Sequence, residues 1–201
     1  MLDLIFDTET TGFARFNDSW EHSSQPHIVQ IAAKLVENEK TYAAFQAIVS
    51  GDVPSSAGAF TTHMITESLR NRVGITPGDA ARIFSVLLER ANRLVAHNMK
   101  FDLILIGALF RRRGFDTTRL TEIPKFCTML ALTPVMKLPG SRGGYKWPKL
   151  EEAYKAYIDP AGFSGAHDAM ADTIACQKLF EICKGMKLVP EGGKYGRNDA
   201  I

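Results

Sequence analysis

The stretch that decides the fold is Ile5-Phe6-Asp7-Thr8-Glu9-Thr10-Thr11-Gly12, near the start of a chain of 201 residues. Apolar residues lead into it from Leu2 and predict a β-strand that ends in a polar cluster. Two acids stand two residues apart at that end, so both side chains project from one face, about 6.6 Å apart along the strand. A solvated strand end can also carry such a pair, so the pair alone leaves its role open.

The elements around this strand predict an α/β domain. Further strands are predicted over residues 27–36, 41–49 and 93–97, and helices over residues 77–91, 98–113, 149–157 and 169–184. Thr76 and Asn98 are placed to cap the first two of these helices, and Pro77 suits a first helical position. Strands that begin as a hairpin and later alternate with helices predict a mixed sheet flanked by helices.

The composition fits one compact domain, with 45% hydrophobic and 23% charged residues. We expect it to cover residues 1–184, with a loosely ordered tail over 185–201. The chain shows neither a membrane span nor a secretory signal, which predicts a cytoplasmic protein without membrane contact. The net charge of +2 neither requires nor excludes a polyanionic partner. Three cysteines without Cys-x-x-Cys spacing, Cys127, Cys176 and Cys183, are predicted to be buried thiols.

Two more acids face the predicted core from helices. Asp102 and Asp172 each lie in a first helical turn, in line with an apolar stripe on the same helix. An acid in this position also complements the helix dipole, which is an alternative reason for Asp102. Burying several ionised carboxylates is costly unless cations lie between them, and no basic residue is predicted on these faces. Mg²⁺ or Mn²⁺, which prefer carboxylate and water ligands, are the expected cations.

A histidine precedes the last acid by five positions. On one continuous helix, His167 and Asp172 would point about 140° apart. With Asp168 as the N-cap, however, His167 lies on the entering loop and can reach the start of the helix. An imidazole there stands where a water nucleophile must lose its proton. Because a histidine is more often an ordinary hydrogen-bonding residue, and this is one of five in the chain, the pattern alone leaves both readings open.

Taken together, Asp7-x-Glu9, Asn98-x-x-Phe101-Asp102 and His167-x4-Asp172 resemble the three exonuclease motifs of the DnaQ-like, DEDDh branch of the DEDD superfamily. The resemblance covers residues 2–180 in order, spacing and local sequence. It implies a ribonuclease-H-like fold, with a mixed five-stranded sheet and helices on both faces. It also implies hydrolysis of phosphodiester bonds from the 3′ end, which releases nucleoside monophosphates.

The resemblance also implies the roles of the five site residues. Asp7 would bridge two metal ions, while Glu9 and Asp172 complete the shell of the first ion. Asp102 would act on the second ion, through water, and His167 would be the general base. The two ions, Mg²⁺ or Mn²⁺, would lie roughly 4 Å apart, one generating hydroxide and the other stabilising the leaving oxygen.

Candidate substrate contacts come from two further segments. Residues 62–66, Thr-His-Met-Ile-Thr, resemble a family segment that lies beside the terminal nucleotide, but Met64 replaces its glycine. His63 and Ile65 are therefore candidates, although Ile65 could equally be buried in an ordinary turn. Hydrogen bonding makes Thr10 and Asn98 further candidates.

A predicted loop over residues 139–148 interleaves cations with two aromatic side chains. Arg142 and Lys146 can contact phosphates while Tyr145 or Trp147 stacks on a base. The alternative is a solvated connection in which Trp147 anchors the next helix.

The leading hypothesis is an exonuclease that acts on single-stranded or frayed 3′ ends of DNA. Residues 6–12 and the basic loop resemble DNA-processing relatives more than they resemble members that trim short RNA or transfer RNA. An RNA-trimming exoribonuclease of the same family is one alternative, since stacking and phosphate contacts do not discriminate sugars. A non-catalytic nucleic-acid-binding module is another, although the intact acids and His167 argue against it. No residue pattern specifies a polymerase partner or an oligomeric state.

Overall fold

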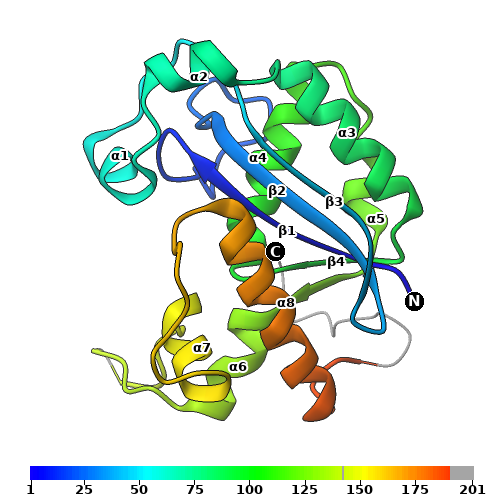
Figure 1. The fold of residues 1–201 in the computed structure, drawn as a ribbon, viewed down its shortest axis with the longest axis vertical. Coiled ribbons are helices and arrows are strands. Elements are labelled where there is room, and N and C mark those ends of the chain that lie inside the picture. The colour runs from blue at the N-terminus through cyan, green and yellow to red at the C-terminus, as the bar shows by residue number, and fades with distance from the viewer. Residues whose placement is uncertain (142, 191–201) are drawn as a thin grey trace.

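The computed structural model describes residues 1–141 and 143–190, so that Arg142 and the tail over 191–201 lie outside the described residues. Its centre is a five-stranded sheet in the order β3-β2-β1-β4-β5 (Figure 1). The first three strands form an antiparallel meander, and the other two run parallel to the first. The predicted mixed five-stranded sheet is confirmed. Its strands are β1 (Asp3–Thr10), β2 (Ile28–Glu37), β3 (Lys40–Ile48), β4 (Arg93–Ala96) and β5 (Lys125–Cys127).

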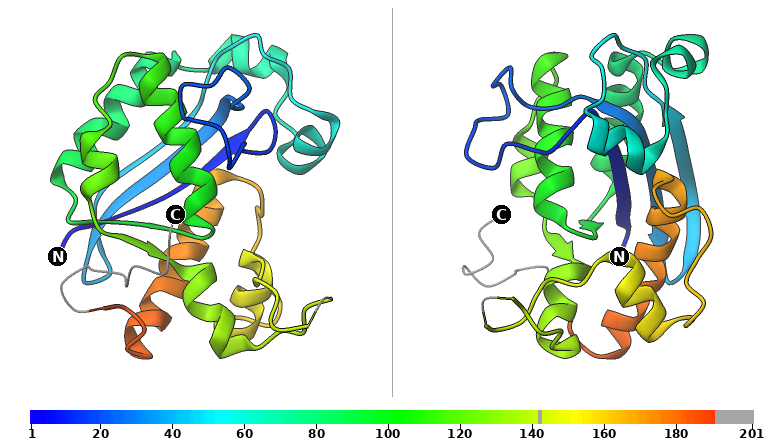
Figure 2. Two further views of the ribbon diagram at one scale, coloured as in Figure 1. Left: turned by 180° about the vertical axis from the view of Figure 1, so that it is seen from behind. Right: turned by 90° about the vertical axis from the view of Figure 1, so that its left-hand side faces the viewer.

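Helices cover both faces of the sheet (Figure 2). They are α1 (Ala57–His63), α2 (Glu67–Val73), α3 (Pro77–Arg90), α4 (Met99–Arg112), α5 (Thr118–Glu122), α6 (Thr128–Met136), α7 (Leu150–Tyr157) and α8 (Ala169–Gly185). One buried core joins the sheet to α3, α4 and α5, and a second joins it to α7 and α8. Leu188 and Val189, just beyond α8, pack against the second core.

Strand β1 lies between these two cores and contributes alternate side chains to each. Leu4 and Phe6 belong to the core beneath α3 and α4, whereas Ile5 belongs to the core beneath α8. Because side chains alternate along a strand, the acids at positions 7 and 9 lie on the α8 side and Thr8 lies on the α4 side. The end of β1 can therefore bring its two acids toward α8 while Thr8 reaches α4.

The predicted long helices form close to their expected limits. Thr76 caps α3 by accepting a hydrogen bond from the Asp79 amide, and Pro77 is the first residue of that helix. Asn98 stands at the N-cap position of α4, but its side chain makes no capping hydrogen bond. The cap prediction is wrong in this respect because Asn98 is left-handed, with φ of 70°, whereas side-chain caps normally have extended backbone.

The remaining expectations concern the thiols and the membrane. Cys127, Cys176 and Cys183 are all buried and free, as predicted. In the described ranges, we find no helix whose length and apolar character would let it cross a bilayer.

Candidate active site

Three of the five predicted site residues converge at the end of β1. Ligand atoms of Glu9, His167 and Asp172 all lie within 4.8 Å of one another. Glu9 comes from β1, Asp172 from the first turn of α8, and His167 from the loop that enters α8. Residues separated by more than 150 positions in sequence are thereby brought to one point by the packing of α8 against β1.

Asp102 reaches the same site from α4, and its charge acts on Asp7. It lies in the first turn of α4, and only 3% of its surface is exposed. Its Oδ1 accepts hydrogen bonds from the Thr8 hydroxyl, at 2.7 Å, and from the Thr8 amide, at 3.1 Å. The inward orientation predicted from its helical position is confirmed.

The electrostatics of the acids show that they share one environment. Burial raises the pKa of Asp7 well above its ordinary value, and the charges of Asp102, Asp172 and Glu9 raise it further. For Glu9, burial followed by the charge of Asp172 raises the pKa to about 8. Burial likewise raises the pKa of Asp102 to about 7 and that of Asp172 to about 6. The folded protein therefore resists ionising all of these groups together, as expected for carboxylates crowded at one site.

Asp3, on the same strand, is an acid that the protein pairs with its own basic residues. Asp3 forms a buried ion pair with Arg93, at 2.7 Å, and a longer contact with Lys184. Within the described residues, by contrast, Asp7, Glu9, Asp102 and Asp172 form no ion pair.

One buried oxygen at the site also lacks any partner. Oδ2 of Asp172 accepts a hydrogen bond from the His167 amide, at 3.2 Å, but its buried Oδ1 has none within the described residues. Leaving such an oxygen unsatisfied is costly. A site made of carboxylate oxygens without protein cations, and with one oxygen unused, fits a hard divalent cation.

The loop before α8 is fixed by two glutamines that the sequence did not single out. Asp168 caps α8 by accepting hydrogen bonds from the Met170 and Ala171 amides, as predicted. Its second oxygen accepts hydrogen bonds from the side chains of Gln30 and Gln46, at 2.7 and 2.8 Å. An amide side chain at a buried position of the apolar strand β2 was the available signal. The neighbouring His167 adopts a left-handed conformation, with φ of 69°.

In the segment over residues 62–66, the candidate contacts His63 and Ile65 are buried within the protein. His63 is 8% exposed: its Nδ1 accepts the Ile65 amide at 2.9 Å, and its Nε2 lies 3.4 Å from the Ser55 hydroxyl. Ile65 is also 8% exposed. Met64 adopts the left-handed conformation that glycine takes readily, with φ of 57°, and 63% of its surface is exposed. Met64 therefore follows the backbone path that a glycine would take, and it is the exposed residue among His63, Met64 and Ile65.

The other two candidate contacts differ in their freedom. Thr10 is buried, and its hydroxyl donates a 2.6 Å hydrogen bond to the Gly12 carbonyl. Its side chain therefore shapes the turn after β1. Asn98 is partly buried, and its side chain has no hydrogen-bond partner within the described ranges.

The loop over residues 139–148 exposes both aromatic side chains, with 52% of Tyr145 and 65% of Trp147 accessible. Trp147 is therefore not the anchor of the next helix. The anchor is Pro148, whose carbonyl accepts a 2.9 Å hydrogen bond from His97 Nε2. His97 Nδ1 lies 2.9 Å from the Thr128 hydroxyl, and burial lowers the His97 pKa to about 4, so this histidine stays neutral. Lys146 pairs with Glu152, and Arg142 lies outside the described residues.

Comparison with known proteins gives matches over most of the chain. The model of the exonuclease family, RNase_T, matches residues 4–180. A DNA polymerase III of the PolC type from Caldanaerobacter subterraneus subsp. tengcongensis is 32% identical over 116 residues, which are 55% of this chain and 7% of that protein.

Solved structures of exonuclease I from E. coli share the fold. With a dA16 oligonucleotide bound, that enzyme aligns with a TM-score of 0.74 and 21% identity over 93% of this chain and 42% of its own. With a dT13 oligonucleotide, the TM-score is 0.73 at 20% identity, over 91% and 41%. This chain thus spans less than half of each of these proteins. Because the family model covers all five site residues in one continuous match, the chain belongs to the exonuclease family, in its DnaQ-like branch with a ribonuclease-H-like fold.

Proposed function

We propose that the chain is a metal-dependent 3′-to-5′ exonuclease that hydrolyses terminal phosphodiester bonds of DNA, at a single strand or a frayed 3′ end, and releases nucleoside monophosphates. One observation carries the proposal: Glu9, His167 and Asp172 meet within 4.8 Å, at a site whose acids have no cation of the described chain beside them. Membership of the exonuclease family supports the same chemistry.

Two divalent cations, Mg²⁺ or Mn²⁺, suit the set of oxygen ligands. Asp7, Glu9 and Asp172 would hold one, and Asp7 and Asp102 would hold the other. When bound, such ions supply Lewis-acid activation of water and stabilise the charge that develops during phosphoryl displacement. The crowding of the acids, which keeps their pKa values high without metal, is relieved when cations neutralise them.

His167 is suited to accept the proton of the attacking water. Its side chain is exposed at the site, and its ring has no hydrogen-bond partner within the described residues. The bond from its amide to Asp172 and the clamp on Asp168 fix its backbone, so the imidazole has a defined approach to the carboxylates. A positioned base of this kind contributes roughly 10²–10⁴-fold to a rate.

DNA is the favoured substrate because of the relatives. The matched exonuclease I structures contain DNA oligonucleotides, and the PolC relative is a DNA polymerase. Tyr145 and Trp147 offer exposed rings on which bases of a single strand can stack.

The test uses 5′-labelled single-stranded DNA and RNA of one sequence, with Mg²⁺, with Mn²⁺ and with a chelator. We expect DNA products that shorten stepwise from the 3′ end, released deoxynucleoside monophosphates, and no reaction in the chelator. Cleavage of circular single strands would contradict the exonuclease assignment. Faster shortening of RNA would assign the substrate class to RNA, and binding without cleavage in either metal would favour a binding module.

A further inference from the structure

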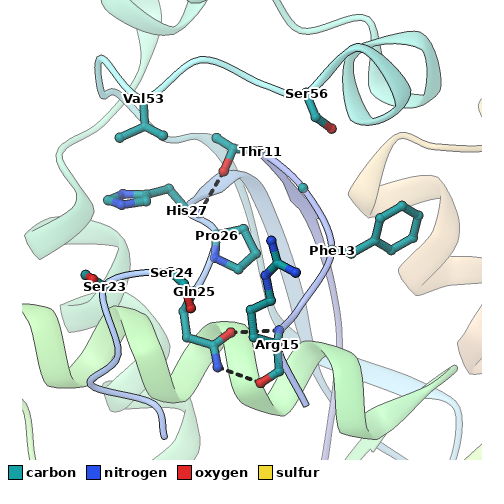
Figure 3. A pocket seen from close by; sticks show the side chains of 11 residues that line it. Thr11, Phe13, Arg15, Ser23, Ser24, Gln25, Pro26, His27, Val53 and Ser56 are labelled. Carbon is teal, nitrogen blue, oxygen red and sulfur yellow. Dashed lines mark hydrogen bonds between the residues drawn. The ribbon is translucent and has the colours of Figure 1, made fainter. Parts of the chain in front are cut away.

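A cavity of about 490 Å³ lies beside the end of β1, outside the acid cluster (Figure 3). Parts of three segments line it: residues 11–15, which follow β1, residues 23–27, which precede β2, and residues 53–56, which precede α1. We call it the loop cavity. Ser23, Ser24 and Ser56 are among its lining residues, but the Ser24 hydroxyl donates to Asp18, at 2.8 Å, and the Ser56 hydroxyl accepts the Ala59 amide, at 3.3 Å.

Arg15 brings a positive charge into the loop cavity. The guanidinium of Arg15 points into the space between Thr11, Pro26 and Phe13 (Figure 3), and it has no partner within the described residues. Arg112 stands behind one wall and donates to the carbonyls of Gln25 and Pro26.

A second arginine stands behind the opposite wall. Arg70 is 2% exposed and donates hydrogen bonds to the carbonyls of Val49, at 3.1 Å, and Val53, at 2.8 Å. Like Arg15 and Arg112, it forms no ion pair in the described ranges. Together with burial, the fields of Arg112, Arg70 and Arg113 lower the pKa of His27 on the wall, whereas only Asp52 acts in the opposite direction. The chemical complement of this cavity is an anion.

Hydrogen bonds and close packing hold the loops that line the cavity. The side-chain amide of Gln25, 1% exposed, brackets the backbone of Arg15: its Oε1 accepts the Arg15 amide at 3.0 Å, and its Nε2 donates to the Arg15 carbonyl at 2.9 Å. Trp20 lies so close over α4 that a Cβ on Gly107 would stand 2.3 Å from its ring. The backbone that carries Arg15 therefore has a defined position beside the cavity.

The loop cavity lies directly beyond the end of β1, the strand that carries Asp7 and Glu9. Thr11 follows Glu9 by two residues, about 6.6 Å along an extended chain. Its amide donates to the His27 carbonyl and its carbonyl accepts the Ser56 amide, both at 2.8 Å, so Thr11 joins all three lining segments. A nucleic-acid strand whose terminal phosphodiester lies at the acids therefore has its next phosphates within reach of the wall formed by residues 11–15.

From this geometry we infer that the loop cavity is a second phosphate-binding site, in which Arg15 holds a backbone phosphate of the nucleic-acid strand next to the linkage that is cut. The inference rests on the proposed function, because that function places the strand end at the acids. Arg15 would contribute affinity without sequence preference, since phosphate contacts carry no base information.

The test measures binding of a short 5′-labelled single-stranded oligonucleotide by fluorescence anisotropy, in a chelator so that no turnover occurs. Arg15→Ala is compared with the wild type and with Arg82→Ala, which removes the same charge from an exposed position of α3. We expect Arg15→Ala to weaken binding roughly tenfold for every sequence tested. The slope of log affinity against log salt should fall by about 0.7, the value for one phosphate of a single strand. Arg82→Ala should match the wild type, and all three proteins should unfold at the same temperature.

Equal affinities and salt slopes for Arg15→Ala and Arg82→Ala would overturn the inference. A site that binds only a free anion would also overturn it. In that case inorganic phosphate would raise the unfolding temperature of the wild type but not of Arg15→Ala, while both proteins would bind the oligonucleotide equally well. The two proposals fail separately. Stepwise nucleotide release without any dependence of binding on Arg15 leaves the proposed function standing, whereas Arg15-dependent binding without release in Mg²⁺ contradicts that function alone.

Discussion

Thr8 donates two hydrogen bonds to Asp102 Oδ1, one from its hydroxyl at 2.7 Å and one from its amide at 3.1 Å. Burial raises the pKa of Asp102 to about 7, and these two donors oppose that rise. Strand β1 therefore carries two acids of the site on one side and orients a third from the other. The relationship makes Thr8 a positioning residue, because it acts through Asp102.

Replacing Thr8 by Val should weaken metal binding. The substitution keeps the shape of the side chain but removes the hydroxyl donor, so the pKa of Asp102 should rise further and its orientation should loosen. Loss of such an outer partner commonly costs about 10–100-fold in metal affinity or activity. Calorimetric titration with Mn²⁺ measures the affinity, and Thr8→Ser, which keeps the donor, should restore it. Equal Mn²⁺ affinities for Val and Thr at this position would show that the hydrogen bond from the Thr8 amide is enough to position Asp102.

Removing one acid should abolish turnover while the fold survives. We expect no nucleotide release from Asp7→Ala or Asp172→Ala in Mg²⁺. In a chelator near neutral pH, the unfolding temperature of both variants should equal or exceed that of the wild type, because the substitution relieves crowding among the carboxylates. Glu89→Ala, an exposed acid on α3, should leave both quantities unchanged. Near-normal release from either site variant would contradict the proposed metal ligands.

His167→Ala should separate proton transfer from metal binding. The rate should fall by roughly 10²–10⁴-fold, the usual contribution of a positioned base. Mn²⁺ affinity should stay within a few-fold of the wild type, since the carboxylates are intact. Single-turnover assays with saturating metal give the rate, and calorimetry gives the affinity. An unchanged rate at neutral pH would remove His167 from the proposed role.

The metal-free protein should lose stability as the pH rises. In the unfolded chain the site carboxyls titrate near about 4, but in the folded protein Glu9, Asp102 and Asp172 have pKa values of about 8, 7 and 6. The folded state therefore keeps protons that the unfolded state has released. The stability that these protons contribute is fully present below about pH 4 and is lost as the pH rises through about 6 to 8. Thermal unfolding in a chelator should show this decline. Saturating Mg²⁺ should reduce it, and a flat profile without metal would contradict the raised pKa values.

Met64→Gly should stabilise the protein. A left-handed backbone costs a residue with a Cβ about 1 kcal/mol, and glycine avoids this cost. Urea unfolding should therefore show a gain of about 1 kcal/mol for Met64→Gly. Met64→Ala keeps the Cβ and should show little gain, because the exposed side chain contributes little packing. Equal stability of the Gly and Ala variants would mean that the backbone at this position relaxes without cost.

The sequence predicted those parts of the fold that local pattern determines. Helices α3, α4 and α8 have long apolar stripes, and Thr76 and Asp168 cap two of them as expected. The short elements α1, α2, α5, α6 and β5 were not predicted from residue patterns. Helices of this length are marginal by themselves, and they form here because of what they pack against.

The candidate site divides in the same way. Asp102 and Asp172 were placed inward from helical periodicity, and the structure agrees. The clamp from Gln30 and Gln46 onto Asp168 joins residues more than 120 positions apart, so no local pattern could reveal it. The left-handed backbone of Asn98 was missed because its residue type suits a helix cap equally well.

The alternation of β1 between two helical layers makes the strand intolerant of length changes. Deleting a single residue between Ile5 and Asp7 would move every later side chain to the opposite side of the sheet. Both acids would then turn toward α4, and the threonine that serves Asp102 would turn toward α8, although no functional side chain had been altered. We therefore expect insertions and deletions in this strand to be as damaging as loss of an acid, whereas conservative exchanges among its apolar residues should be tolerated.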